Sequence, residues 1–261
     1  MSNIVVVTGG ASGIGLGSAK RLAALGWTPV ILDREQAVER LRNPGEGQER
    51  VDFAALACDV ASPQQIRQTF RAIGETYGRI DALVCSAGVF RSGALDEMSV
   101  EDFDTLFAVN TRGAWLCARE AVPLLKGRPE AEGPARIVLI GSVSGLRPKI
   151  GSGAYAASKE ALHVLTRVMA VELAPERILV NGIAPGTTDT PMTQAQASDP
   201  SPGKFRLSGT SPLGRTGKPE DIAKVVEFLV GEQSSYVTGV IVPVDGGTRA
   251  AFVAGGGAPK A

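Results

Sequence analysis

Short apolar runs alternate along the chain with segments whose apolar residues recur at helical spacing. The apolar runs predict strands over residues 4–8, 29–32, 53–57, 80–85, 137–140, 178–183 and 240–244. The periodic segments predict helices over residues 13–25, 63–77, 100–125, 154–173 and 219–230. Nearly continuous apolar strands separated by helices are typical of a parallel sheet that is covered on both faces. With right-handed crossovers, the pattern predicts an α/β fold: a single doubly wound Rossmann-type domain with a seven-stranded parallel sheet.

The pattern shows no composition break and no internal repeat, so we expect one domain over residues 1–249. Residues 189–218 are rich in Pro, Ser, Gly and Thr and form a long connection without a clear period. Connections of that length inside a compact domain are usually functional, which predicts a substrate lid over 189–218. Residues 43–50 are expected to form a loop, and residues 250–261 a loose tail.

Composition excludes several classes of function. Hydrophobic residues make up 44% and charged residues 21%, which favours a soluble globular protein. Lys plus Arg and Asp plus Glu both number 27, so no general attraction to nucleic acid or to a membrane is expected. Three scattered cysteines and a single histidine argue against a disulfide framework, a metal site and Ser-His-Asp catalysis. We expect no metal, no membrane span and a cytoplasmic location.

Glycines gather between the first predicted strand and the first predicted helix, in the segment Thr8 to Gly15. Glycine lets a backbone approach a ligand closely, and a helix N-terminus presents N–H groups and partial positive charge to a pyrophosphate. Asp33 ends the next strand, where a carboxylate can accept both ribose hydroxyls of NAD and repel the 2′-phosphate of NADP. NAD is therefore the expected cofactor, although the adjacent Arg34 is a cation that can pair with that phosphate.

Tyr155 and Lys159 carry the main catalytic signal, because a spacing of four puts both side chains on one helix face. A nearby ammonium favours the phenolate and is expected to lower the pKa of the tyrosine. Ser142 follows the fifth predicted strand, where its hydroxyl can hold the reacting oxygen toward Tyr155. Asn110 lies within a predicted long helix, where asparagine is a poor helix former; it can hold a water that links Lys159 to solvent.

These residues resemble the motifs of the short-chain dehydrogenase/reductase family, from Thr8 to about Gly247. Thr8, Gly9, Gly13 and Gly15 match its glycine-rich loop; Asp59 and Val60 match its adenine-contacting pair; Asn110, Ser142, Tyr155 and Lys159 match its catalytic tetrad; and Pro185, Gly186, Thr188 and Thr190 match its nicotinamide loop. The resemblance implies a small-molecule alcohol or ketone substrate. It also implies a homotetramer built on the helices 100–125 and 154–173.

The chain departs from the family at Cys85-Ser86-Ala87-Gly88, where the family usually has Asn-Asn-Ala-Gly and uses the asparagines to steady the sheet. Residues and resemblance together assign cofactor contacts to Gly9, Ser12, Gly13, Ile14, Gly15, Asp33, Asp59, Val60, Ser86, Ala87, Gly88, Tyr155, Lys159, Pro185, Thr188 and Thr190. They assign substrate contacts to Ser144, Lys149, Gly186, Met192 and Phe205.

Hydride transfer between a secondary alcohol and a ketone is the predicted reaction. The sequence leaves several hypotheses for the substrate and the function. Loops near Lys149, Thr190 and Phe205 are similar to those of 2,3-dihydro-2,3-dihydroxybenzoate dehydrogenases. If the substrate is a carboxylated ring alcohol, the cation of Lys149 would orient its carboxylate; the alternative is that Lys149 lies in a solvated basic loop. The alternatives are a 3-oxoacyl carrier-protein reductase, which usually takes NADPH, and a non-catalytic dinucleotide sensor. A Rossmann-like methyltransferase has a glycine loop but no need of the Tyr-Lys pair. His163 and Cys85 are expected to be packing residues.

Overall fold

The structure is a computed structural model that describes residues 2–45, 51–126, 128–197 and 211–251. Phe205 and most of the predicted tail 250–261 lie outside the described residues. Within the described ranges, no helix is long and apolar enough to cross a membrane.

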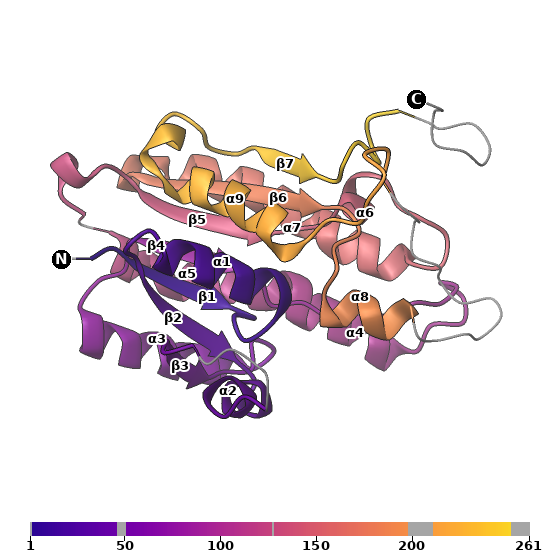
Figure 1. Ribbon diagram of the computed structural model, residues 1–261, viewed down its shortest axis with the longest axis horizontal. Coiled ribbons are helices and arrows are strands. Elements are labelled where there is room, and N and C mark those ends of the chain that lie inside the picture. Colours follow the sequence, from indigo (N-terminus) through magenta and orange to yellow (C-terminus); the bar gives the residue numbers. More distant parts are fainter. Residues whose placement is uncertain (1, 46–50, 127, 198–210, 252–261) are drawn as a thin grey trace.

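Seven parallel strands form one sheet, in the order β3-β2-β1-β4-β5-β6-β7. The strands are β1 Ile4–Thr8, β2 Thr28–Asp33, β3 Ala54–Ala57, β4 Ala82–Cys85, β5 Ala135–Ile140, β6 Ile178–Pro185 and β7 Ile241–Val244. All of them point toward the end of the molecule where α6 and α8 lie (Figure 1). The doubly wound parallel sheet predicted from the sequence is confirmed, and its order reverses between β1 and β4.

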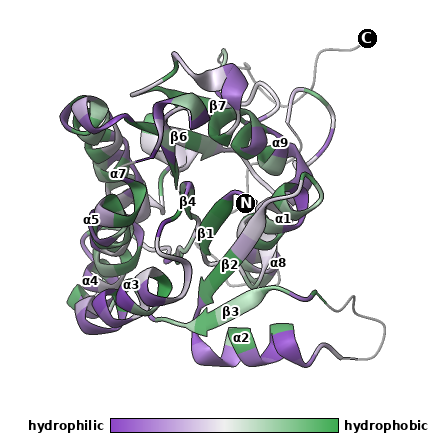
Figure 2. Cartoon of the chain, turned by 90° about the vertical axis from the view of Figure 1, so that its left-hand side faces the viewer, coloured by the Kyte–Doolittle hydropathy of each residue, from purple (hydrophilic) through white to green (hydrophobic). Residues whose placement is uncertain are grey.

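Helices cover both faces of the sheet, with α3, α4, α5 and α7 on one side and α1 and α9 on the other (Figure 2). The helices are α1 Gly13–Ala23, α2 Glu35–Arg42, α3 Pro63–Tyr77, α4 Val100–Phe107, α5 Ala114–Leu125, α6 Val143–Leu146, α7 Gly153–Glu172, α8 Pro191–Ala197 and α9 Pro219–Val230. The central strands are mostly hydrophobic, whereas α2 is mostly hydrophilic (Figure 2).

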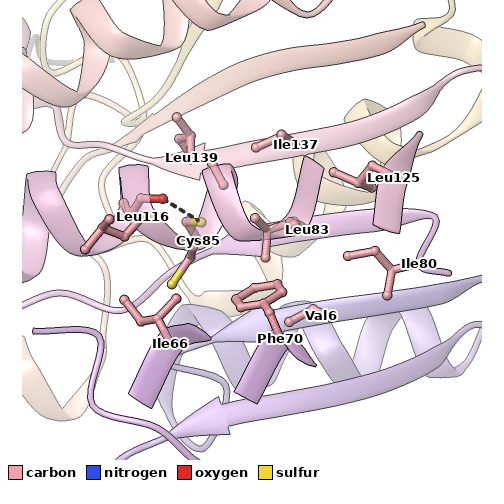
Figure 3. Packing of buried hydrophobic residues seen from close by; sticks show 14 of the residues in the cluster. Val6, Ile66, Phe70, Ile80, Leu83, Cys85, Leu116, Leu125, Ile137 and Leu139 are labelled. Carbon is pink, nitrogen blue, oxygen red and sulfur yellow. Dashed lines mark hydrogen bonds between the residues drawn. The ribbon is translucent and has the colours of Figure 1, made fainter. Parts of the chain in front are cut away.

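Alternate side chains of each central strand enter different cores. In β1, Val6 belongs to the core beneath α3, α5 and α7, while Val5 and Val7 belong to the core beneath α1 and α9. Figure 3 shows the first core, where Phe70 of α3 lies opposite Leu83 of β4. Because both faces are buried, most strand positions are apolar, with exceptions such as Arg136 of β5 and Asn181 of β6.

Helices α2, α6 and α8 and the predicted helix 100–125 differ from the sequence prediction. Helix α2 was not predicted, because it is short and strongly polar and Val38 is its buried side chain. Helix α8 begins inside the predicted irregular lid. The predicted helix 100–125 is divided into α4 and α5 by a π-helical turn, Ala108–Gly113, which contains Asn110. Single π-helical turns within α-helices are often found at functional sites.

Candidate active site

A cavity of about 530 Å³ opens at the carboxyl ends of the strands. It is lined by residues that follow β1, β4, β5 and β6, among them Gly9, Ser86, Ser142 and Gly186. Its position at the reversal of strand order, between β1 and β4, is where open α/β sheets bind their ligands. The sheet topology therefore brings together loops that lie far apart in the sequence.

The glycine-rich loop forms the floor at one end of this cavity. Gly9 and Gly13 have φ angles of 64° and 52°, in the left-handed region that favours glycine. A Cβ atom at Gly9 would lie 2.7 Å from the backbone of Ala87, and one at Gly15 would lie 2.2 Å from the carbonyl oxygen of Gly9. Only glycine allows this close packing, which keeps the N-terminus of α1 open toward the cavity.

The N-terminus of α1 carries no acidic residue in its first turn, and Ser12 precedes it in extended conformation without capping it through its side chain. The partial positive charge of the helix end is therefore not neutralised by the helix itself. This arrangement suits an anionic pyrophosphate, as the fit of a nicotinamide dinucleotide requires.

Asp33 is fixed at the far end of the cavity. Its Oδ2 accepts a hydrogen bond from the backbone N–H of Ala11 at 3.1 Å, and its Oδ1 accepts one from the backbone N–H of Arg34 at 2.8 Å. Asp33, Arg34 and Asp59 all line the cavity. A carboxylate held in this way lies within the region where an adenosine ribose would be expected.

The chain replaces the usual asparagines after β4 with Cys85 and Ser86, and other groups hold this segment. The buried Cys85 Sγ donates to the carbonyl oxygen of Ala114 at 3.6 Å (Figure 3). Burial raises the pKa of this thiol to about 12, which keeps it protonated as a donor. The backbone N–H of Ser86 donates to Thr8 O at 3.1 Å, and the N–H of Ala87 donates to Thr8 Oγ1 at 3.2 Å. The segment is therefore attached to both β1 and α5.

Tyr155, Lys159 and Ser142 all line the same side of the cavity. Lys159 Nζ donates to the carbonyl oxygen of Ile140 at 2.9 Å and lies 6.0 Å from the ring centroid of Tyr155. Burial lowers the pKa of Lys159 to about 8. Burial raises the pKa of Tyr155, an effect that the Ser142 hydroxyl partly opposes by hydrogen bonding. The expected lowering of the Tyr155 pKa is not seen, because the enclosure of the phenol outweighs the hydrogen bond with Ser142.

Asn110 lies one layer behind the cavity wall. Its Oδ1 accepts from the backbone N–H of Val89 at 2.8 Å, while Nδ2 donates to Val89 O at 3.0 Å and to Ser158 Oγ at 3.1 Å. The side-chain amide thus holds the loop after β4 against α7. A Cβ atom at Gly88 would lie 3.3 Å from Asn110 Oδ1 and 3.5 Å from Lys159 Nζ, so both groups approach the same point.

The cavity gathers most of the predicted site residues. Of the predicted cofactor contacts, all except Gly15 line it, and Gly15 instead packs beneath the Gly9 backbone. Of the predicted substrate contacts, Gly186 and Met192 line it. Ser144 and Lys149 do not, because they lie in and after α6, and Lys149 is exposed.

Two residues that sequence reasoning missed lie against Tyr155 or line the cavity. Phe90 packs edge-on against Tyr155, with ring centroids 4.9 Å apart and an interplanar angle of 64°. Arg91 lines the cavity and pairs with Asp102, Nε to Oδ1, at 2.9 Å. Their only signal in the sequence is that they follow Gly88 closely, whereas their distance from Tyr155 depends on the fold.

Comparison with known proteins places this geometry in a family. The family described as enoyl-(acyl carrier protein) reductase matches residues 9–249. A rhamnolipid-biosynthesis 3-oxoacyl-[acyl-carrier-protein] reductase of Pseudomonas aeruginosa is 37% identical over 251 residues, which cover 94% of this chain and 95% of that protein.

Two solved structures are similar over nearly the whole chain. A 3-ketoacyl-(acyl-carrier-protein) reductase from Brucella melitensis, complexed with NADH, has a TM-score of 0.82 and 29% identity, covering 94% of this chain and 98% of the other. The Pseudomonas aeruginosa RhlG/NADP complex has a TM-score of 0.82 and 35% identity, covering 94% and 96%. The protein therefore belongs to the short-chain dehydrogenase/reductase family, whose members use a nicotinamide dinucleotide to interconvert alcohols and carbonyl compounds.

Proposed function

We propose that the protein uses NAD to interconvert a secondary alcohol and its ketone, with Tyr155 as the acid–base group. The observation that carries the proposal is the convergence of Tyr155, Lys159 and Ser142 on one wall of a cavity whose far end holds Asp33. Each of these residues, taken alone, has an ordinary structural explanation. No such explanation accounts for their common position beside a glycine-lined helix N-terminus.

In the oxidation direction, Ser142 holds the substrate hydroxyl, and the phenolate form of Tyr155 takes its proton as the carbon–oxygen double bond forms. A bound oxidised nicotinamide would supply the hydride acceptor and a positive charge that favours the phenolate. Lys159 is proposed to hold the ribose and to exchange a proton, since its pKa of about 8 places both charge states within reach near neutral pH. Asn110 keeps the loop after β4 in place through Val89.

Asp33 supports the choice of NAD, because a 2′-phosphate would meet a carboxylate that two backbone N–H groups already hold in place. Arg34 is the one feature nearby that favours the phosphate, and it lines the same cavity. The similar structures hold NADH in one case and NADP in the other. The proposal for this chain therefore rests on its own Asp33.

The substrate remains open between two classes. A carboxylated ring alcohol was expected to use Lys149, which does not line the cavity. Arg91 does line it, and we propose that Arg91 would orient the carboxylate of such a substrate instead. A 3-oxoacyl thioester is the second candidate, favoured by the similarity to acyl-carrier-protein reductases. Met192, which lines the cavity, offers an apolar contact to either class.

The test measures turnover with NAD and with NADP for a panel of secondary alcohols, dihydrodiols and 3-oxoacyl thioesters, followed by the absorbance of the reduced nicotinamide. We expect turnover with NAD. Tyr155→Phe should lose about a hundredfold to ten-thousandfold in kcat, the usual contribution of a general acid–base group, while NAD binding stays within a few-fold. A Tyr155→Phe variant with a near-native rate would contradict the acid–base assignment.

Titration calorimetry tests the cofactor preference by measuring the affinities for NAD and NADP. The native protein should bind NAD more tightly than NADP, and Asp33→Ser, with Arg34 kept, should shift the preference toward NADP. Tighter binding of NADP by the native protein would show that Asp33 does not select the cofactor.

A further inference from the structure

His163 is a buried group that the proposed mechanism does not use. It lies on α7, one turn beyond Lys159, with 1% of its side chain exposed. The sequence contains no other histidine. Histidine is costly to bury and chemically versatile, so the groups that surround it indicate its role.

The imidazole fits into space that two glycines leave open beneath the Ser142 turn. A Cβ atom at Gly141 would lie 2.1 Å from His163 Nε2, and one at Gly145 would lie 2.8 Å from Cε1. Gly141 directly precedes Ser142, and Gly145 lies in α6, which Ser142 caps. The ring is therefore packed under both ends of the short segment that carries Ser142.

Charge fixes which form of the ring is present. His163 Nδ1 is 2.8 Å from Glu160 Oε2, and Glu160 also pairs with Arg167 at 3.2 Å. The carboxylate can only accept, so the proton lies on Nδ1. Nε2 faces Gly141 and has no hydrogen-bond partner among the described residues. Burial lowers the pKa of His163, and Glu160 opposes that effect.

We propose that His163 is a positioning residue, whose neutral ring, anchored by Glu160, supports the Gly141–Gly145 turn and so fixes the hydroxyl of Ser142. The inference rests on the proposed role of Ser142. Ser142 Oγ already accepts a hydrogen bond from Ser144 N at 3.1 Å, so its position follows that of the turn. Removing the ring leaves a cavity into which the turn can relax, and a shift of about 1 Å in a reacting group can cost about a hundredfold in rate.

The experiment is a double-mutant cycle in the full-length protein with His163→Ala, Ser142→Ala and the double variant. His163→Ala should lower kcat by about tenfold to a hundredfold, with KM for NAD within about twofold. In the Ser142→Ala background the same change should alter kcat by less than about twofold, because residues that act through one another are not additive. Met169→Ala, a truncation elsewhere on α7, is the matched control, and should lower thermal stability without lowering kcat.

A second variant covers the case in which His163→Ala does not fold. Glu160→Gln keeps the ring and changes a residue that is 42% exposed, and it weakens the anchor at Nδ1. It should lower kcat several-fold in the native background and leave it unchanged in the Ser142→Ala background.

Equal losses in the native and Ser142→Ala backgrounds, or an equal loss in Met169→Ala, would overturn the positioning role while leaving the proposed function intact. Native kcat in Ser142→Ala would instead overturn the proposed role of Ser142, and this inference with it.

Discussion

Lys159 lies buried with its ammonium group hydrogen-bonded to the carbonyl oxygen of Ile140, and 4% of the residue is exposed. Burial in this position favours the neutral amine, which explains a pKa of about 8 against an ordinary value of 10.5. A group whose charged form is disfavoured by folding reduces the stability of the fold. The buried Lys159 is therefore expected to lower the free energy of unfolding.

Replacing Lys159 by Met should abolish turnover and raise the free energy of unfolding at pH 7 by about 2 kcal/mol. The estimate takes 1.36 kcal/mol per pKa unit, less the hydrogen bond lost at Ile140 O. The unfolded lysine titrates near 10.5 and the folded one near 8, so the native protein carries the full penalty below pH 8 and none above 10.5.

Urea unfolding of the native protein and the Lys159→Met variant across that pH range checks the prediction. The gap in stability should be largest at and below pH 8 and should close as the pH rises toward 10.5. A variant less stable than the native protein throughout would show that the ammonium is not penalised.

Among the elements, the π-helical turn Ala108–Gly113 does the most to shape the site. It turns Asn110 toward Val89 and Ser158, and Thr111 Oγ1 donates to Ser158 O at 2.8 Å. On its other side it packs against the loop after β3, where a Cβ atom at Gly113 would lie 2.6 Å from the carbonyl oxygen of Val60. This one turn therefore contacts both the loop that carries Asp59 and Val60 and the part of α7 next to Lys159.

Gly113→Ala should weaken NAD binding by about tenfold, because the new methyl group must push the Asp59–Val60 loop or the turn aside. A loss of that size corresponds to about 1.4 kcal/mol. Isothermal titration with NAD measures it, and Gly45→Ala is the control, since a Cβ atom there meets nothing within 4 Å. Equal affinities for the two variants would show that the loop tolerates the methyl group.

For the whole molecule, the outer surface of α4, α5 and α7 carries several exposed apolar side chains. Phe103, Trp115, Val164, Val168 and Val171 are exposed there, Val171 by 75%. Exposed apolar patches of this kind mark interaction sites. We therefore propose the homotetramer that the family resemblance implies, built on these helices.

Val168→Glu should convert the assembly to smaller species, because it would bury carboxylates between subunits. Light scattering after size exclusion measures the mass. Leu25→Glu is the control, because Leu25 is similarly exposed, at 50%, and follows α1, on the opposite face of the sheet. A native protein that elutes as a monomer would refute the tetramer.

The sequence by itself determined the sheet, the glycine-rich loop, Asp33 and the Tyr155–Lys159 pair. These features depend on local rules: alternation of buried faces, conformations open only to glycine, and the spacing of side chains one helical turn apart. Each can be read within about twenty residues. The helices missed at this level were the short or polar ones, α2, α6 and α8, because few of their described side chains are buried.

Only the tertiary structure decided what surrounds those residues. Phe90 reaches Tyr155, and Asn110 reaches Val89 and Ser158, through contacts between segments that the sequence keeps far apart. The pKa of Tyr155 rises because enclosure outweighs the hydrogen bond with Ser142, a balance that spacing along a helix does not reveal. His163 reads as ordinary packing until Gly141 and Gly145 are seen against its ring. Burial and charge environment are properties of the assembled fold. Local sequence pattern therefore predicts which groups react, whereas long-range packing determines their contacts and pKa values.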